Sequence, residues 1–417
     1  MDSCFRPLSS LVGRRRGSND QNCPINENNF QKHVPDVSHE KIVLKGMRIV
    51  FSSNLWGLSY LIPMPHPSLI MNRYPISEIV FARCITIVRA LNGLCACYST
   101  NLSKFICFMN SKNGEIVRSV FYNEFDNSVI KVSVLPCDSY SRIRCFVHNL
   151  DDILIGNNKD CFEIFGNNTI QYPGFVEFDF LNAVSIVYTG LNNNYRIYST
   201  KNYDKLYELL NKGISDIKIT QTSIILLSIS HKNKLIVSFI DIKKGILIKK
   251  IQVRIDSSFD ILFFEHIEFN LIIKQKSQEA FSYNLLSEEH KNIQNTSYLA
   301  ASCFTFLYKA RKMIIFNNGS FDVYSFKGDI ICSLKCNTFF EAHPIAISSD
   351  QNYFICLSKE LSTQVIHMIR LNDCSCCFKG YLHEDFCKGN KITSFAYDET
   401  NHCLIVCDEV GSVHFWN

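Results

Sequence analysis

The chain has 417 residues and a mass of 48.0 kDa, which is enough for two or three ordinary domains or for one large repeat domain. Hydrophobic residues make up 47% and charged residues 20%, with only 17 Gly and 10 Pro, and this composition excludes a collagen-like, coiled-coil or wholly disordered protein. The 43 basic and 39 acidic residues leave a formal net charge of +4, so charge alone gives no reason to expect a nucleic-acid partner.

The first 40 residues are polar and turn-rich and lack a sustained hydrophobic period. They predict a flexible arm, followed by one folded domain over residues 41–417. Within the arm, Arg14, Arg15 and Arg16 form a short basic run close to Ser18. Such a run is usually a solvated cluster, and its alternatives are a localisation signal, a contact with an acidic surface, or the context of a phosphorylated Ser18. These arginines are a weak candidate for an interaction site.

Neither a secretory signal nor a membrane span is expected. The start, MDSCFRPLSS, has no basic segment followed by an apolar one, and Arg83 and Arg89 interrupt the longest apolar stretch, residues 79–91. Several of the 19 cysteines lie in apolar runs, as Cys107 and Cys407 do, which predicts reduced, buried thiols. We therefore expect an intracellular protein, cytoplasmic or nuclear.

From Lys41 onward, short apolar runs rich in Ile, Val, Phe and Tyr alternate with Asn, Asp, Ser, Gly and Lys. This pattern predicts strands almost throughout. Only residues 202–212 and 287–295 suggest helix, and the first of these fits a strand followed by a turn almost as well. The fold class is therefore all-β.

A unit of three or four strands recurs along the chain. Its clearest copy is 214–253, where Gly245 supplies the positive φ of a short hairpin turn. A fixed period of about 40–50 residues is typical of a β-propeller. The other copies and their glycine turns are 94–122 with Asn113-Gly114, 304–334 with Asn318-Gly319 and Lys327-Gly328, 345–376, and 392–417.

The blade number and the closure of the ring follow from the same repeat. Dividing residues 41–417 by seven gives about 54 residues per blade and by eight about 47, against about 40–45 in common repeats, and we prefer seven blades with one insert while eight stay possible. The last copy ends at its third strand, Ser412 to Trp416. Because an incomplete blade leaves the ring open, residues 42–51 or 78–88 are expected to complete it.

Residues 343–358 and 392–416 resemble the first three strands of WD40 repeats, with Trp416-Asn417 in place of the usual Trp-Asp ending. His343 and Asp350 fit the blade-start and turn positions, where such side chains steady the blade. The likeness covers residues 343–417 directly and extends to residue 94 through the internal repeat. It implies a WD40-like propeller, a fold that typically serves as a platform for binding.

One group of residues has metal-ligand spacing. Cys374, Cys377, His383 and Cys387 give C-x2-C-x5-H-x3-C, and three thiolates with one imidazole would suit zinc. The segment lies where a fourth strand is needed, however, and adjacent strand residues point to opposite faces, so ordinary strand cysteines are the preferred interpretation. Cys95 and Cys97 are likewise interpreted as core residues.

No nucleophile elbow, H-E-x-x-H motif or phosphate-binding loop is present, and we expect no enzyme activity and no cofactor. The leading functional hypothesis is a non-catalytic scaffold, a subunit of a complex, that presents propeller loops and rim to protein or peptide partners. The alternatives are an enzyme site in the central channel, which would need convergent titratable groups with perturbed pKa values, and a nucleic-acid or zinc-binding module.

Overall fold

A computed structural model gives the fold of this chain. The residues it describes are 49–54, 75–100, 104–166, 169–171, 174–189, 194–210, 213, 214, 216–220, 223–230, 234–254, 261–267, 270–275, 281–286, 290–292, 303–317, 320–326, 329–335, 345–348, 350–360, 363–382, 391–398, 403–409 and 411–416.

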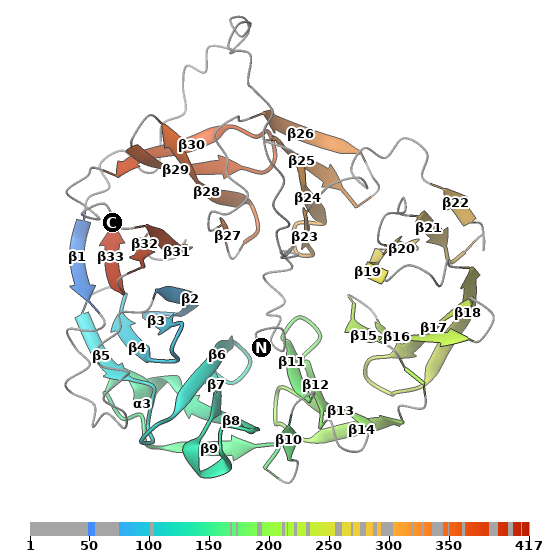
Figure 1. Ribbon diagram of the computed structural model, residues 1–417, viewed down its shortest axis with the longest axis horizontal. Coiled ribbons are helices and arrows are strands. Elements are labelled where there is room, and N and C mark those ends of the chain that lie inside the picture. Colours follow the sequence, from blue (N-terminus) through green and yellow to red (C-terminus); the bar gives the residue numbers. More distant parts are fainter. Residues whose placement is uncertain are drawn as a thin grey trace, which may run out of the picture.

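Eight antiparallel sheets are arranged in a ring (Figure 1). Each sheet is built from strands that follow one another in the chain, and the first of these strands lies innermost. The exception to this chain order is β1, which is added to the sheet of β31, β32 and β33 as its outer strand. We call these sheets blades 1 to 8, in the order of their inner strands. Blade 1 contains β2 (Ile76–Ala82), β3 (Ile85–Ala90), β4 (Cys95–Ser99) and β5 (Lys104–Phe108), and blade 2 contains β6 (Ile116–Asn123), β7 (Ser128–Val134), β8 (Arg142–Asn149), β9 (Cys161–Ile164) and β10 (Ile170–Gln171). Blade 3 contains β11 (Phe175–Asp179), β12 (Val184–Tyr188), β13 (Asn194–Ser199) and β14 (Lys205–Leu210). Blade 4 contains β15 (Asp216–Ile219), β16 (Ser223–Ser230), β17 (Lys234–Asp241) and β18 (Leu247–Arg254).

The second half of the ring repeats the plan. Blade 5 contains β19 (Ile261–Ile267), β20 (Asn270–Gln275), β21 (Phe281–Asn284) and β22 (His290–Asn292), and blade 6 contains β23 (Cys303–Leu307), β24 (Lys312–Asn317), β25 (Ser320–Ser325) and β26 (Ile330–Lys335). Blade 7 contains β27 (Ile345–Ile347), β28 (Tyr353–Glu360), β29 (Thr363–Arg370) and β30 (Cys376–Leu382). Blade 8 contains β31 (Ile392–Asp398), β32 (Cys403–Asp408), β33 (Ser412–Trp416) and β1 (Ile49–Asn54). The protein is therefore a single β-propeller, as its repeat predicted.

The hydrophobic core lies between neighbouring blades. Ile130 and Val132 of blade 2, for example, share one buried cluster with Val176 and Phe178 of blade 3. Because a sheet in the ring has a neighbour on each face, some middle strands are buried along their whole length, as β7 and β32 are. This double burial explains why the strands appear in the sequence as nearly continuous apolar runs.

The preference for seven blades was wrong, since the ring has eight. The calculation began at residue 41, whereas the first blade begins at Ile76. Residues 76–416 shared among eight blades give about 43 each, within the usual range of such repeats.

The ring closes through a strand from the amino-terminal side, as predicted. β1 pairs antiparallel with β33, with Ile49 opposite Trp416 and Asn54 opposite Ser412, and so becomes the outer strand of blade 8. The first of the two proposed segments, 42–51, overlaps this strand. The second, 78–88, was wrong: it belongs to the β2–β3 hairpin of blade 1, which turns at Arg83, a residue with positive φ.

The structure describes two of the predicted glycine turns, and it confirms one of them and corrects the other. Gly245, at φ +67°, lies between β17 and β18 as expected, and a Cβ there would come within 2.6 Å of the Tyr207 ring. Gly114 lies between β5 of blade 1 and β6 of blade 2, so it serves the link between blades and not a hairpin within one blade. Both glycine turns proposed in residues 304–334 lie outside the described residues.

Neither suggested helix is found, and for residues 202–212 the strand that the sequence left open as an alternative is confirmed. Residues 202–212 contain strand β14 and residues 287–295 contain strand β22, both outermost in their sheets. The α-helix that the described residues do contain is α3 (Leu150–Leu154), which the repeat pattern did not predict. No helix in the described part of the chain has the length and apolar character needed to cross a membrane.

Candidate interaction site

Blade 2 departs from the regular plan at its outer edge. The free edge of β8 is shared by two short strands, with Cys161 of β9 opposite His148 and Ile170 of β10 opposite Ile143. Between β8 and β9 the chain forms α3, so the outer strand of this blade is split and carries a helical insertion. Among the described blades this is the five-stranded one.

Local interactions hold α3 on the rim. The Asn149 side chain caps the helix by accepting a hydrogen bond from the Asp151 backbone N–H at 2.8 Å. Leu150 and Ile153 are buried in the cluster between blades 1 and 2. The Asn158 amide also donates to the Phe108 carbonyl of blade 1. The insertion is therefore anchored to two blades at once.

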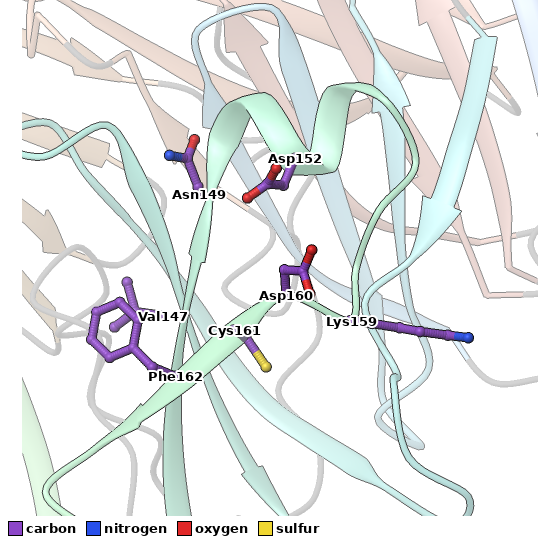
Figure 2. Close-up of a pocket in the computed structure, with 7 residues that line it drawn as sticks. All are labelled: Val147, Asn149, Asp152, Lys159, Asp160, Cys161 and Phe162. Atoms are coloured by element: carbon purple, nitrogen blue, oxygen red, sulfur yellow. The ribbon is translucent and has the colours of Figure 1, made fainter.

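A depression of about 420 Å³ opens beside α3, lined by Val147, Asn149, Asp152, Lys159, Asp160, Cys161 and Phe162. Figure 2 shows two kinds of wall: Asp152 and Asp160 project into the space between α3 and β9, whereas Val147 and Phe162 lie together on the other side of the strands. The Lys159 side chain points away from the two carboxylates (Figure 2). The depression therefore offers negative charge between α3 and β9, and the apolar surface near it is the exposed ring of Phe162 on the other side of the strands, since Val147 is buried.

The surroundings of the depression are unusually apolar for a solvent-facing rim. Phe162 is 57% exposed and Ile155 is 79% exposed. The Phe162 ring makes an edge contact with Tyr203 of blade 3, at 6.0 Å between ring centroids. Exposed large apolar side chains beside a depression are typical of a surface that binds another molecule.

Beneath this rim lies a buried ion pair. Lys131 Nζ is 2.9 Å from Glu115 Oε1, both side chains are fully buried, and Lys131 also donates to the Met109 carbonyl at 2.8 Å. Burial alone would raise the pKa of Glu115, but the Lys131 ammonium and several hydrogen bonds lower it on balance. The Glu115 carboxylate is therefore favoured inside the blade 1–blade 2 interface.

His148 and Cys161 face each other across β8 and β9, and this pair must be considered as a possible nucleophile and base. Burial, with the nearby Lys131, lowers the pKa of His148 to about 3, so the imidazole is neutral. Burial raises the pKa of Cys161, so its thiol keeps its proton. Both shifts oppose a thiolate–imidazolium pair, and the arrangement favours a structural interpretation.

Titratable groups also meet on the inner strands. Lys218 of β15 forms an ion pair with the fully buried Glu265 of β19, and it donates to the Phe264 carbonyl at 3.2 Å. Burial and the Glu265 carboxylate raise the pKa of Tyr308, which follows β23. These contacts join the inner strands of adjacent blades near the channel, and their charges are matched to one another.

In the described part of the chain, the predicted metal ligands do not form a site. Cys374 is bonded to Cys332, which corrects the expectation of reduced thiols for these two residues. Cys377 is partly buried, and His383 and Cys387 lie outside the described residues. The described part of the chain contains no cluster of three metal-ligating side chains.

The remaining candidates have structural surroundings or cannot be placed. Cys95 and Cys97 are fully buried in the core between blades 1 and 2, as expected. Asp350 accepts a hydrogen bond from the Asn352 backbone N–H at 2.8 Å and thereby steadies the turn before β28. His343 lies outside the described residues, as do the three arginines 14–16 and Ser18.

The fold defines the class of this protein as a WD40-like β-propeller. Over 82% of this chain and 96% of the other, it is similar to the C-terminal WD40 domain of Sif2, with 11% identity and a TM-score of 0.52. The computationally designed Ika8 protein has 10% identity and a TM-score of 0.50, over 83% of this chain and 96% of that one. BamB from Moraxella catarrhalis has 10% identity and a TM-score of 0.45, over 89% and 98% of the two chains. At such identities the likeness concerns the fold alone.

The chain belongs to the family described as "Domain of unknown function (DUF7899)", whose model matches residues 64–416. The matched segment contains all the strands of the ring except β1. No curated protein matches the chain.

Proposed function

We propose that this protein is a non-catalytic scaffold that binds a protein or peptide partner at the rim of blade 2. The observation that carries the proposal is the acidic depression beside α3, with the exposed ring of Phe162 across the strands, at the point where the blade departs from the repeated plan. Loops and insertions on a rigid scaffold are where binding residues concentrate.

The lining residues indicate the chemistry of the partner. The carboxylates of Asp152 and Asp160 suit a Lys or Arg side chain, and the exposed ring of Phe162, on the other side of the strands, suits an apolar one. A peptide segment or loop that places a basic residue in the depression and an aliphatic or aromatic residue against Phe162 would satisfy both features.

A non-catalytic role is favoured by the state of the titratable groups. His148 is held neutral beside a protonated Cys161. The buried charges of Glu115 and Glu265 each have a lysine partner. Groups arranged in this way stabilise blade interfaces and leave none of these residues poised as an acid or base.

An intracellular location forms part of the proposal. Cys137 is a free and exposed cysteine. Exposed thiols persist most readily in a reducing compartment, where the Cys332–Cys374 bond would have to resist reduction.

The test is affinity isolation of partners with the full chain from cell extract, followed by a direct binding measurement. Replacing Asp152 and Asp160 together by Asn, or Phe162 by Ser, should weaken a recovered partner at least about tenfold. Asp204→Asn, in an exposed turn of blade 3, and Leu181→Ser, whose side chain is 56% exposed, serve as matched controls. Melting curves establish that each variant is folded. Recovery of no stoichiometric partner, or equal binding by site and control variants, contradicts the proposal.

A further inference from the structure

The hairpin between β17 and β18 carries a second surface of a different kind. Residues 243–250 read KKGILIKK, with four lysines around three branched aliphatic residues and no acidic residue among them. The segment forms the turn and the start of β18, which is the outermost strand of blade 4 (Figure 1). We call residues 243–250 the blade 4 tip.

The aliphatic side chains of the tip are exposed in succession. Ile246 is 61%, Leu247 is 51% and Ile248 is 61% exposed. Leu247 and Ile248 are successive strand residues and point to opposite faces, so their exposure means that both faces of β18 are uncovered at its start. Exposing three branched aliphatic side chains at one place is unfavourable in water unless another phase or molecule receives them.

The tip is held in place by its own turn. The Asp241 carboxylate accepts hydrogen bonds from the backbone N–H groups of Lys243 and Lys244, at 2.9 and 2.7 Å. Tyr207 of blade 3 packs its ring against Gly245 and donates to the Ile242 carbonyl at 2.6 Å. The exposed side chains are therefore presented on an ordered support.

The lysines give the tip its charge. Lys243, Lys244 and Lys250 are exposed, and none of them forms an ion pair with another described residue. Lys249 is partly buried and donates to the Leu285 carbonyl of blade 5. Lysines on an outermost strand also discourage pairing with other sheets, but that role does not explain the aliphatic residues between them.

From this juxtaposition we infer that the blade 4 tip docks this protein on an anionic lipid membrane. The aliphatic side chains enter the boundary between headgroups and acyl chains, and the lysines on both sides contact lipid phosphates and carboxylates. A membrane fits better than an acidic peptide because the exposed lysines flank three exposed aliphatic side chains, which a lipid surface can receive together. The depression that the described residues form lies instead on blade 2.

The energetics set the size of the effect. A lysine near an anionic leaflet contributes roughly a fivefold increase in partitioning, so reversing the charge of two should weaken binding at least about 20-fold. Added salt should weaken the lysine contribution and leave the aliphatic contribution in place. Binding that depends on both kinds of side chain distinguishes docking by the tip from general electrostatic attraction.

The experiment is co-sedimentation of the full chain with vesicles of phosphatidylcholine alone and of phosphatidylcholine with about 30% phosphatidylserine. The full chain should sediment with the anionic vesicles and stay in solution with the neutral ones. Lys243→Glu with Lys244→Glu should abolish most of this binding. Ile246→Ser, Leu247→Ser and Ile248→Ser together should do the same at unchanged net charge.

Matched controls carry the same changes elsewhere. Lys104→Glu with Lys391→Glu changes the net charge equally, and Leu91→Ser, Leu286→Ser and Ile330→Ser replace aliphatic residues that are 57–70% exposed. Both control variants should bind as the unchanged chain does. A full chain that ignores anionic vesicles, or tip variants that bind like the controls, overturns the inference. Retained binding to an acidic protein but not to vesicles also overturns it, in favour of a protein partner.

This inference is separable from the proposed scaffold role. The variant with Asp152→Asn and Asp160→Asn should bind vesicles normally, and the tip variants should bind the blade 2 partner normally. Failure of one set of results therefore leaves the other intact.

Discussion

Phe51 of β1 lies opposite Phe415 of β33, in the sheet that joins the amino-terminal and carboxy-terminal parts of the described chain. The Phe415 side chain is fully buried between blade 8 and blade 1, with its ring 5.6 Å from that of Tyr98. β1 lies upstream of the segment that matches the family model, so the ring is completed by a strand from outside that segment.

Removing either closing strand should destabilise the whole ring. Truncation before Gly411 deletes β33, and loss of the buried Phe415 alone costs about 3–5 kcal/mol. Deleting residues 1–54 removes β1 and exposes the edge of β33. Deleting residues 1–40 leaves every described strand present and should leave thermal unfolding nearly unchanged. Melting curves of the three truncations check this, and a β33 deletion that melts like the full chain would disprove the closure.

Removing one partner of the buried ion pair of blade 2 should lower the free energy of unfolding strongly, whereas replacing both partners should lower it little. Lys131→Met leaves Glu115 buried without its cation and should lower the free energy of unfolding by about 3–5 kcal/mol, measured in urea. Adding Glu115→Gln should restore most of that loss.

The same pair has a pH signature. The folded-state pKa of Glu115 lies below its unfolded value, so its stabilising contribution is present at neutral pH and is lost as the pH falls through the folded pKa. Without Lys131, burial raises the pKa of Glu115, so the Lys131→Met deficit should shrink as the pH falls, beginning above the ordinary Glu value of about 4.3. A deficit that stays constant with pH would exclude the ion pair as its cause.

His148 should make the protein sensitive to acid. Because burial lowers its pKa to about 3 in the folded protein, the unfolded chain takes up a proton first as the pH falls below the ordinary histidine value of 6.5. The free energy of unfolding should then fall by about 1.4 kcal/mol per pH unit from this residue alone. His148→Leu should remove that slope between about pH 6 and 4 while changing stability little at pH 8. Unfolding curves across this range test it, and an unaltered slope would contradict it.

The Cys332–Cys374 bond should stabilise the contact between blades 6 and 7. It links residues 42 apart in sequence, and disulfides of this kind contribute about 2–4 kcal/mol. Cys332→Ser should lower the melting temperature of oxidised protein, and a reductant should lower that of the unchanged chain by the same amount. Cys137→Ser, at an exposed thiol, serves as the control. If reductant has no effect on the unchanged chain, the bond does not hold the blades together.

Much of the fold could be predicted because it is written in local patterns. Residues 214–253 gave the bounds of blade 4 closely, since a β-branched pattern around Gly245 specifies a hairpin wherever it occurs. The copy at 94–122 failed because it crosses from blade 1 to blade 2, and a turn between blades has the same residues as a turn within one. The first 40 residues lie outside the described chain, and the flexible arm stays a prediction.

The candidate site could not be predicted in the same way. Residues 150–160 contain no motif. They are a candidate interaction site only because α3 lies over the interface of blades 1 and 2 in the folded protein. The sequence KKGILIKK of the blade 4 tip is easily recognised. Its exposure is known only from the folded hairpin, because another apolar run, Cys403–Asp408, is wholly buried.

The sequence by itself therefore determined the all-β class, the repeated unit and the need for a closing strand from the amino-terminal side. These depend on hydrophobic period, turn residues and the count of strands in the last unit, all of which are local. The tertiary structure alone decided that the ring has eight blades, that Cys332 meets Cys374, and that Asp152 and Asp160 project into one space between α3 and β9. Each of these depends on which segments distant in sequence lie side by side, and that is set by the packing of one blade on the next.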